Sequence, residues 1–160
     1  MYITNLIFGV SILMSLLAWN QVGKRYFGFG LKNREFRAAV TPMLLLHSFR
    51  FIGLAFIIPG VVNPGLDPSW AFPAAVGDLS AAVLALTALF LVRSNYFRPF
   101  VWIFNIIGAS DLLLAFIKGP LANIVPSLGA AYFIIIILVP LLILTHISIF
   151  KLLLHKRPIE

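Results

Sequence analysis

Five long apolar stretches constrain this chain of 160 residues more than any other feature. A helix needs about 20 apolar residues to cross the hydrocarbon core of a bilayer, and unpaired backbone groups cannot face that core. The sequence therefore predicts an all-α membrane protein, a bundle of five transmembrane helices in one domain over residues 1–160. The expected helices cover residues 3–19, 39–62, 72–92, 99–117 and 126–154.

Composition supports lipid as the solvent of this chain. Hydrophobic residues make up 61% of it and charged residues only 11%, against about 25% charged residues in a soluble domain. A formal charge of +7 raises the question of nucleic-acid binding, but the basic residues lie in short segments between the apolar stretches. They leave no solvated basic face, so we expect the lipid bilayer as a partner and no nucleic acid.

The distribution of basic residues predicts the orientation, because lysine and arginine beside transmembrane helices gather on the cytoplasmic side. Lys118 stands alone on one side of the expected bundle, and all other basic residues except Arg50 lie toward the opposite side. These are Lys24, Arg25, Lys32, Arg34, Arg37, Arg93, Arg98, Lys151, Lys156 and Arg157. With five spans, the N-terminus is expected outside and the C-terminus in the cytoplasm. Nothing basic precedes the first stretch, so we expect a mature helix there and not a cleaved signal peptide.

Proline and aromatic residues give narrower predictions. Residues 63–73 are rich in proline and turn formers and predict an outer loop, with Trp70 and Phe72 as anchors at the membrane interface. Residues 41–42, a Thr-Pro pair, resemble a helix N-cap and first-turn proline near the start of the second helix. Pro140 is expected to bend the last helix, since it removes one backbone hydrogen bond.

Six polar or ionisable residues lie inside the apolar stretches, where such side chains are costly and normally face the interior of a bundle. They are His47, Arg50, Asp78, Asn105, Asp111 and His146. Their depths, counted at about 1.5 Å per residue, predict two layers. The outer layer would contain Arg50, Asp78 and Asp111, and the inner layer His47, Asn105 and His146.

For the outer layer, two interpretations stay open. Arg50 cannot lose its proton, so we expect it to face the interior and to pair with Asp111, Asp78 or both. Such a network either fixes helix packing alone or forms a site for a ligand or a proton.

For the two histidines, equal depth on different helices is what axial ligation of one haem b requires. His47 and His146 are therefore possible cofactor ligands. The alternatives are core histidines that hydrogen-bond to Thr145, Ser48 or a backbone carbonyl, and a proton relay. No other metal site is expected, and the chain has no cysteine.

Three segments resemble a family of uncharacterised bacterial integral membrane proteins. They are Phe49–Gly53 (FRFIG), Phe72–Asp78 (FPAAVGD) and Asn105–Leu112 (NIIGASDL). The family's helices carry the patterns R-x-x-G, F-x-x-x-x-G-x-G-D and N-x-x-G-x-x-D-L. The second segment departs from its pattern, with Ala75 or Val76 where glycine is usual. The resemblance implies a bacterial inner-membrane location and singles out Arg50, Asp78, Asn105 and Asp111, but it implies no activity.

The sequence favours a small inner-membrane helix bundle whose buried Arg, Asp and Asn side chains bind a ligand, a proton or a partner. One alternative is a membrane cytochrome of the b type that uses His47 and His146. Another is an accessory subunit of a larger membrane complex, or a homo-oligomer. No phosphate-binding loop, zinc-protease motif or nucleophile motif is present, so enzymatic catalysis is not the favoured interpretation.

Overall fold

The computed structural model describes residues 2–27 and 35–155, and within them the chain forms five helices long and apolar enough to cross a membrane. The spans are Ile3–Tyr26, Phe36–Ile57, Pro68–Phe90, Phe97–Leu121 and Gly129–Leu154. The predicted all-α architecture is confirmed in this part of the chain. The expected basic residues Lys32, Arg34, Lys156 and Arg157 lie outside the described residues.

The second span changes its helical type at mid-length. The α-helix α2 covers Phe36–His47, and a 3₁₀ helix continues it over Ser48–Ile57. Runs of 3₁₀ helix longer than three or four residues are uncommon, and they often mark a functional or strained segment. The prediction of a helix start at Thr41-Pro42 is wrong. Pro42 lies inside α2, and the Thr41 hydroxyl donates to the backbone oxygen of Arg37 at 2.7 Å.

The fifth span also begins irregularly. Short 3₁₀ turns lead into a π-helical turn at Ile134–Leu138, and the α-helix α5 follows over Val139–Leu154. Pro140 stands in the first turn of α5, where its missing N–H needs no partner. The helix changes from π to α geometry just before this proline, and the bend expected at Pro140 stays a prediction.

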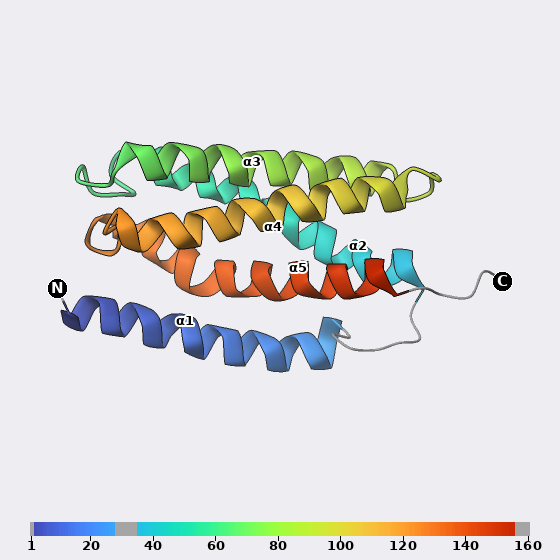
Figure 1. Ribbon diagram of the computed structural model, residues 1–160, viewed down its shortest axis with the longest axis horizontal. Helices are drawn as coiled ribbons and strands as arrows, with labels where there is room; N and C mark the ends of the chain where they lie inside the picture. Colours follow the sequence, from blue (N-terminus) through green and yellow to red (C-terminus); the bar gives the residue numbers. More distant parts are fainter. Residues whose placement is uncertain (1, 28–34, 156–160) are drawn as a thin grey trace.

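Helix α3 (Pro68–Phe90) presents a face of small residues to its neighbours, and α4 (Phe97–Leu121) lies alongside it (Figure 1). Its buried residues are mostly alanine, among them Ala74, Ala81 and Ala85. Small side chains let helix backbones approach closely, which is how helices associate in lipid. The 3₁₀ segment and α4 both pack against α3.

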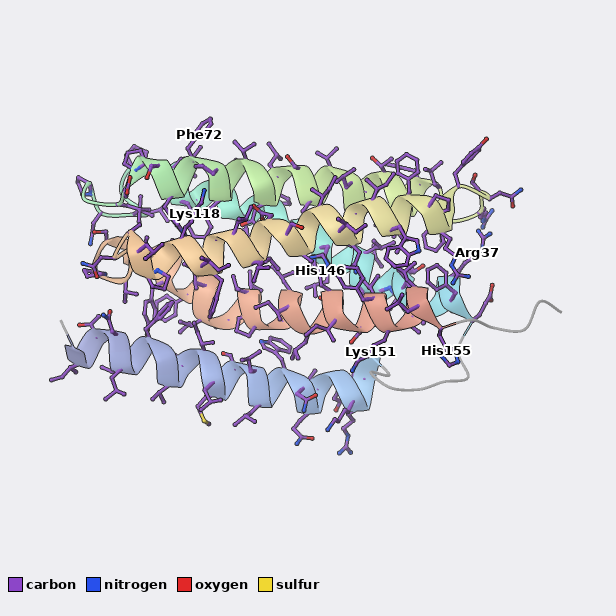
Figure 2. The ribbon with its side chains drawn as sticks, viewed as in Figure 1. Arg37, Phe72, Lys118, His146, Lys151 and His155 are labelled. Carbon is purple, nitrogen blue, oxygen red and sulfur yellow. The ribbon has the colours of Figure 1, made fainter. Side chains whose placement is uncertain are left out.

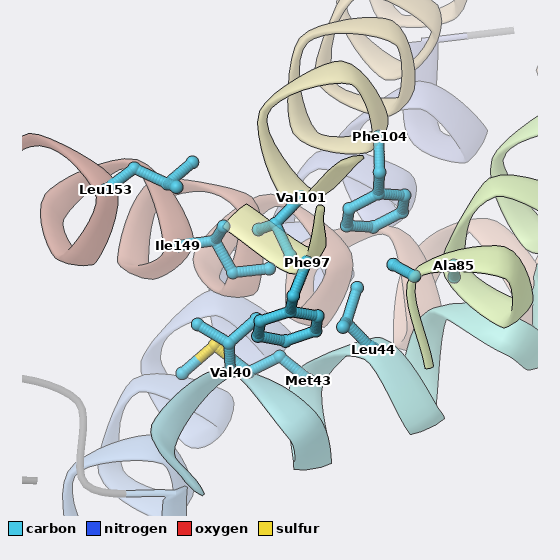
Figure 3. Close-up of a cluster of buried hydrophobic side chains, with 10 residues drawn as sticks. Val40, Met43, Leu44, Ala85, Phe97, Val101, Phe104, Ile149 and Leu153 are labelled. Atoms are coloured by element: carbon cyan, nitrogen blue, oxygen red, sulfur yellow. The ribbon is translucent and has the colours of Figure 1, made fainter. Parts of the chain in front are cut away.

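Two apolar clusters fill the interior, one toward each end of the bundle. Figure 3 shows the first, in which Phe97 and Phe104 of α4 meet side chains of α2, α3 and α5. The second surrounds Phe56 and Trp70 near the other end. The buried polar side chains come from the stretch of chain between the residues of these clusters.

The position of Trp70 contradicts the prediction that it anchors a loop at the membrane interface. Helix α3 begins at Pro68, so only the first part of residues 63–73 is loop. Trp70 is 5% exposed, and its indole N–H donates to the backbone oxygen of Ala115 at 3.0 Å. It is a core residue and not an interface anchor. Phe72 is 61% exposed and points away from the bundle in Figure 2.

Asp67 starts α3 as its N-cap. Its carboxylate accepts a hydrogen bond from the backbone N–H of Ser69 at 2.8 Å. Hydrogen bonds from the side chain and the backbone of Ser69 lower the pKa of Asp67 below its ordinary value. The cap fixes the N-terminal end of the helix that carries Asp78.

Helix α1 (Tyr2–Val22) is peripheral. None of residues 3–22 is buried, and the helix lies along α5 at one side of the bundle (Figure 1). The Trp19 indole N–H donates to the backbone oxygen of Ile137 at 2.8 Å, and the ring of Phe8 contacts that of Tyr132. These contacts attach α1 beside the π-helical turn. Much of the surface of α1 stays apolar and exposed.

Candidate functional site

Arg50 is placed by the 3₁₀ geometry of its segment. In a 3₁₀ helix, residues three apart lie on one line. The buried residues of this segment are Arg50, Gly53 and Phe56, and buried His47 precedes them at the same spacing. The pattern R-x-x-G thus corresponds to one inward stripe, with the charged residue in the middle of the span. Arg50 is 2% exposed.

The Arg50 guanidinium makes four hydrogen bonds and is ion-paired with two carboxylates. Nε donates to Asp78 Oδ1 at 2.7 Å, and Nη2 lies 2.7 Å from both Asp78 Oδ1 and Asp111 Oδ2. Nη1 donates to the backbone oxygen of Gly108 at 3.2 Å and lies 3.3 Å from His146 Nε2. The expected interior position of Arg50 and its pairing with both carboxylates are confirmed.

The contacts of His146 determine its tautomer. A guanidinium can only donate, so His146 Nε2 accepts from Arg50. The proton of the neutral ring then resides on Nδ1, which donates to Asn105 Oδ1 at 2.7 Å. The Asn105 amide nitrogen in turn donates to the backbone oxygen of His146 at 3.2 Å. Arg50, His146 and Asn105 thus form one hydrogen-bonded chain that joins the two layers expected from the sequence.

His47 is held differently. The Thr145 hydroxyl donates to backbone oxygens of its own helix, so it accepts from His47 Nε2–H at 2.9 Å. This is one of the partners expected for a core histidine. Nδ1 of His47 is then an unprotonated, buried nitrogen without a hydrogen-bond partner among the described residues. Buried polar atoms of this kind are rare, and we have no physical account of this one.

The haem hypothesis is not supported by the geometry. Two axial imidazoles must lie on opposite faces of a porphyrin, but the rings of His47 and His146 contact each other, with centroids 4.3 Å apart. Both ring nitrogens of His146 are also engaged in hydrogen bonds. Within residues 2–27 and 35–155, no group of three or more His, Cys, Asp or Glu side chains could hold a metal ion.

Three glycines leave room for the charged side chains. A Cβ atom on Gly53 would overlap Asp78 Oδ2 and lie 2.6 Å from Asp78 Cβ. A Cβ atom on Gly77 would overlap Asp111 Oδ1, and one on Gly108 would lie 2.9 Å from Arg50 Nη1. One of these glycines belongs to each of the three sequence motifs. The motifs therefore combine each polar residue with a glycine that permits a close approach to the cluster.

A cavity of about 540 Å³ extends from the two carboxylates. Asp78 and Asp111 line it at one place, and the rest of its wall is almost entirely apolar. Helix α1 contributes one wall through Phe8 and its neighbours, and Trp70 contributes to another. Phe116, which also lines the cavity, is 55% exposed, so the cavity reaches the outer surface of the bundle.

Each carboxylate uses one oxygen for Arg50. In the described part of the chain, no donor reaches Asp78 Oδ2 or Asp111 Oδ1 within hydrogen-bonding distance. Asp78 is 9% exposed and Asp111 is half-buried. With both carboxylates ionised, the cluster of Arg50, Asp78 and Asp111 carries one negative charge in excess.

The sequence found the charged members of the cluster but missed other parts. All six predicted polar residues meet in one network or contact it. Thr145 was foreseen only as a partner of His47, and the role of the Gly108 carbonyl was missed. The cavity was also missed, because its walls come from residues far apart in the sequence that carry no polar signal.

Comparison with known proteins identifies a family but no activity. A family model described as a domain of unknown function, DUF8737, matches residues 7–154. The chain therefore belongs to the DUF8737 family. No curated protein and no solved structure matches it.

Proposed function

We propose that this DUF8737 protein is a multi-pass protein of the bacterial inner membrane that binds a ligand in the cavity beside Asp78 and Asp111. Its N-terminus would lie outside and its C-terminus in the cytoplasm. The five apolar helices and the exposed apolar side chains around them support a bilayer as the surroundings. A membrane partner or a second copy of the chain stays a prediction.

The orientation is supported by the positions of the charges. In Figure 2, Arg37, Lys151 and His155 lie at one end of the bundle, and Lys118 lies toward the other. Arg98 and Arg37 also contact Phe36 and Phe97, which places cations over aromatic rings at the basic end. Such a basic end is typical of the cytoplasmic side.

A reporter fused after Glu160 is expected to be active only in the cytoplasm, and one inserted beside Leu66 only outside. The reason is the bias of basic residues toward one end of the bundle. Paired alkaline phosphatase and fluorescent-protein fusions measure the two locations. The opposite pattern would show that the orientation is inverted.

One observation carries the proposal of a binding site: a mostly apolar cavity lined at one place by two carboxylates, each with one oxygen that no donor among the described residues reaches. Ligand sites are typically cavities of about 300–1,000 Å³ with mostly apolar walls and a few polar groups. A network that served packing alone would not require this space beside it. Burying an excess charge is costly, so a proton or a ligand cation is needed to balance it.

The apolar reagent dicyclohexylcarbodiimide is expected to label Asp78 or Asp111 from the lipid phase. It reacts with protonated carboxyl groups, so the labelled fraction should fall as the pH rises. Mass spectrometry of peptides from protein in nanodiscs locates the label. Glu35 and Asp67, which lie outside the cavity, serve as internal controls and should react only with a water-soluble carbodiimide. Folded protein in which neither Asp78 nor Asp111 reacts at any pH has no lipid-accessible cavity, and the proposal then fails.

A further inference from the structure

We infer that the occupant of this cavity is a cationic amphiphile, an ammonium group on an apolar body, which binds with its nitrogen at the carboxylates of Asp78 and Asp111. This inference rests on the proposed function, since it names the class of ligand for the same cavity.

The charged end of the cavity selects against anions. The cation that contacts the two carboxylates is Arg50, and four hydrogen bonds within the protein hold its guanidinium. Each carboxylate has one oxygen without a donor among the described residues, and with both carboxylates ionised the cluster carries one negative charge in excess. An ammonium group supplies N–H donors for those oxygens and the missing positive charge at once. A carboxylate or phosphate would add a second uncompensated charge in an apolar setting.

The rest of the cavity suits an apolar body. Its walls include Phe8 and Leu16 of α1, Phe56 of the 3₁₀ segment, Trp70 of α3 and Phe116 of α4. Trp70 precedes Asp78 by eight residues on α3, about 12 Å along the helix. A ligand that places its nitrogen at the carboxylates can therefore pack an apolar chain of this length against the cavity wall.

The mouth of the cavity points to a ligand from the bilayer. Its exposed lining residues include Gly9 of α1 and Phe116 of α4, and also Asn5, Pro120 and Asn123 near one end of the bundle. The lipid-facing sides of these two helices bear further exposed apolar residues, such as Leu113 and Leu13. An amphiphile dissolved in the membrane reaches the cavity without crossing water.

Three probes with the same tail separate the effect of the headgroup from that of the apolar body. These are 11-bromoundecylamine, 11-bromoundecanol and 11-bromoundecanoic acid, whose bromine quenches tryptophan fluorescence on contact. In the variant Trp19→Phe/Trp102→Phe, Trp70 in the cavity wall is the reporter. In phosphatidylcholine nanodiscs, the amine should quench Trp70 at a mole fraction at least tenfold below that of the alcohol, and the acid should be weakest.

Matched variants assign the preference to the carboxylates. Asp111→Asn should remove most of the tenfold advantage of the amine, and Asp67→Asn, an acidic residue outside the cavity, should leave it unchanged. Asp78→Asn is a second variant for the case that Asp111→Asn fails to fold. The variant Trp19→Phe/Trp70→Phe keeps Trp102 as reporter and measures quenching from the bilayer itself.

The outcomes separate the two proposals. Equal quenching of Trp70 by all three probes, above the Trp102 background, keeps the cavity as a binding site but overturns a cationic ligand. Stronger quenching by the acid also overturns it. Quenching of Trp70 that never exceeds the Trp102 background means that no probe enters the cavity, and then the proposed function itself fails.

Discussion

Replacement of Arg50 by methionine is expected to lower the free energy of unfolding by about 3–5 kcal/mol, the loss typical of removing one partner from a buried ion pair. Methionine keeps much of the apolar stem but removes every donor. Asp78 and Asp111 would then lie side by side without a counter-charge, and the Gly108 carbonyl and His146 Nε2 would lose their donor. Denaturation of the detergent-solubilised protein measures the loss.

The carboxylate variants should behave differently from Arg50→Met. Asp111→Asn leaves Arg50 paired with Asp78, so the charges balance and the loss should be smaller. Combining Arg50→Met with Asp78→Asn and Asp111→Asn removes every charge of the cluster and should cost less than the sum of the single changes. Arg93→Met, at an exposed arginine, is the matched control. If Arg50→Met costs no more than Arg93→Met, the cluster does not contribute to stability.

Gly53→Ala is expected to cost about 1–3 kcal/mol, the range for overpacking a filled interior. Its new Cβ would meet Asp78 Cβ at 2.6 Å, so the strain should persist even when Asp78 is replaced by alanine. Gly9→Ala is the matched control, because a Cβ atom on Gly9 meets nothing within 4 Å and alanine favours a helix. Thermal denaturation of both variants in the same detergent makes the comparison.

For Gly77→Ala, we expect thermal denaturation to give a result that differs from that of Gly53→Ala. The three heavy atoms nearest to its new Cβ are all side-chain atoms of Asp111 beyond Cβ, so Asp111 should rotate away and lose Arg50. In an Asp111→Ala background, Gly77→Ala should therefore cost little. A cost that persists in that background would show that Gly77 is needed for another reason than the clearance of Asp111.

The sequence alone determined the helices and the charged members of the site. Apolar stretches of about 20 residues can only be helices in lipid, whatever packs against them. Arg50, Asp78 and Asp111 stood out because a charge inside such a stretch requires a partner. A prediction that depends on the packing of neighbouring helices was wrong. Trp70 was assigned to the membrane interface, but its side chain is buried and donates to a backbone carbonyl of α4.

The tertiary structure decided which partners the side chains find and what space is left between them. The histidines at equal depth proved to be in ring contact, because depth along a helix does not determine its rotation about its axis. The 3₁₀ geometry of residues 48–57 aligned Arg50 with Gly53, which no count at α-helical rise could reveal. The cavity exists because the peripheral α1 covers apolar side chains of other helices, and an apolar residue looks the same in the sequence whether it faces lipid, a neighbour or a cavity.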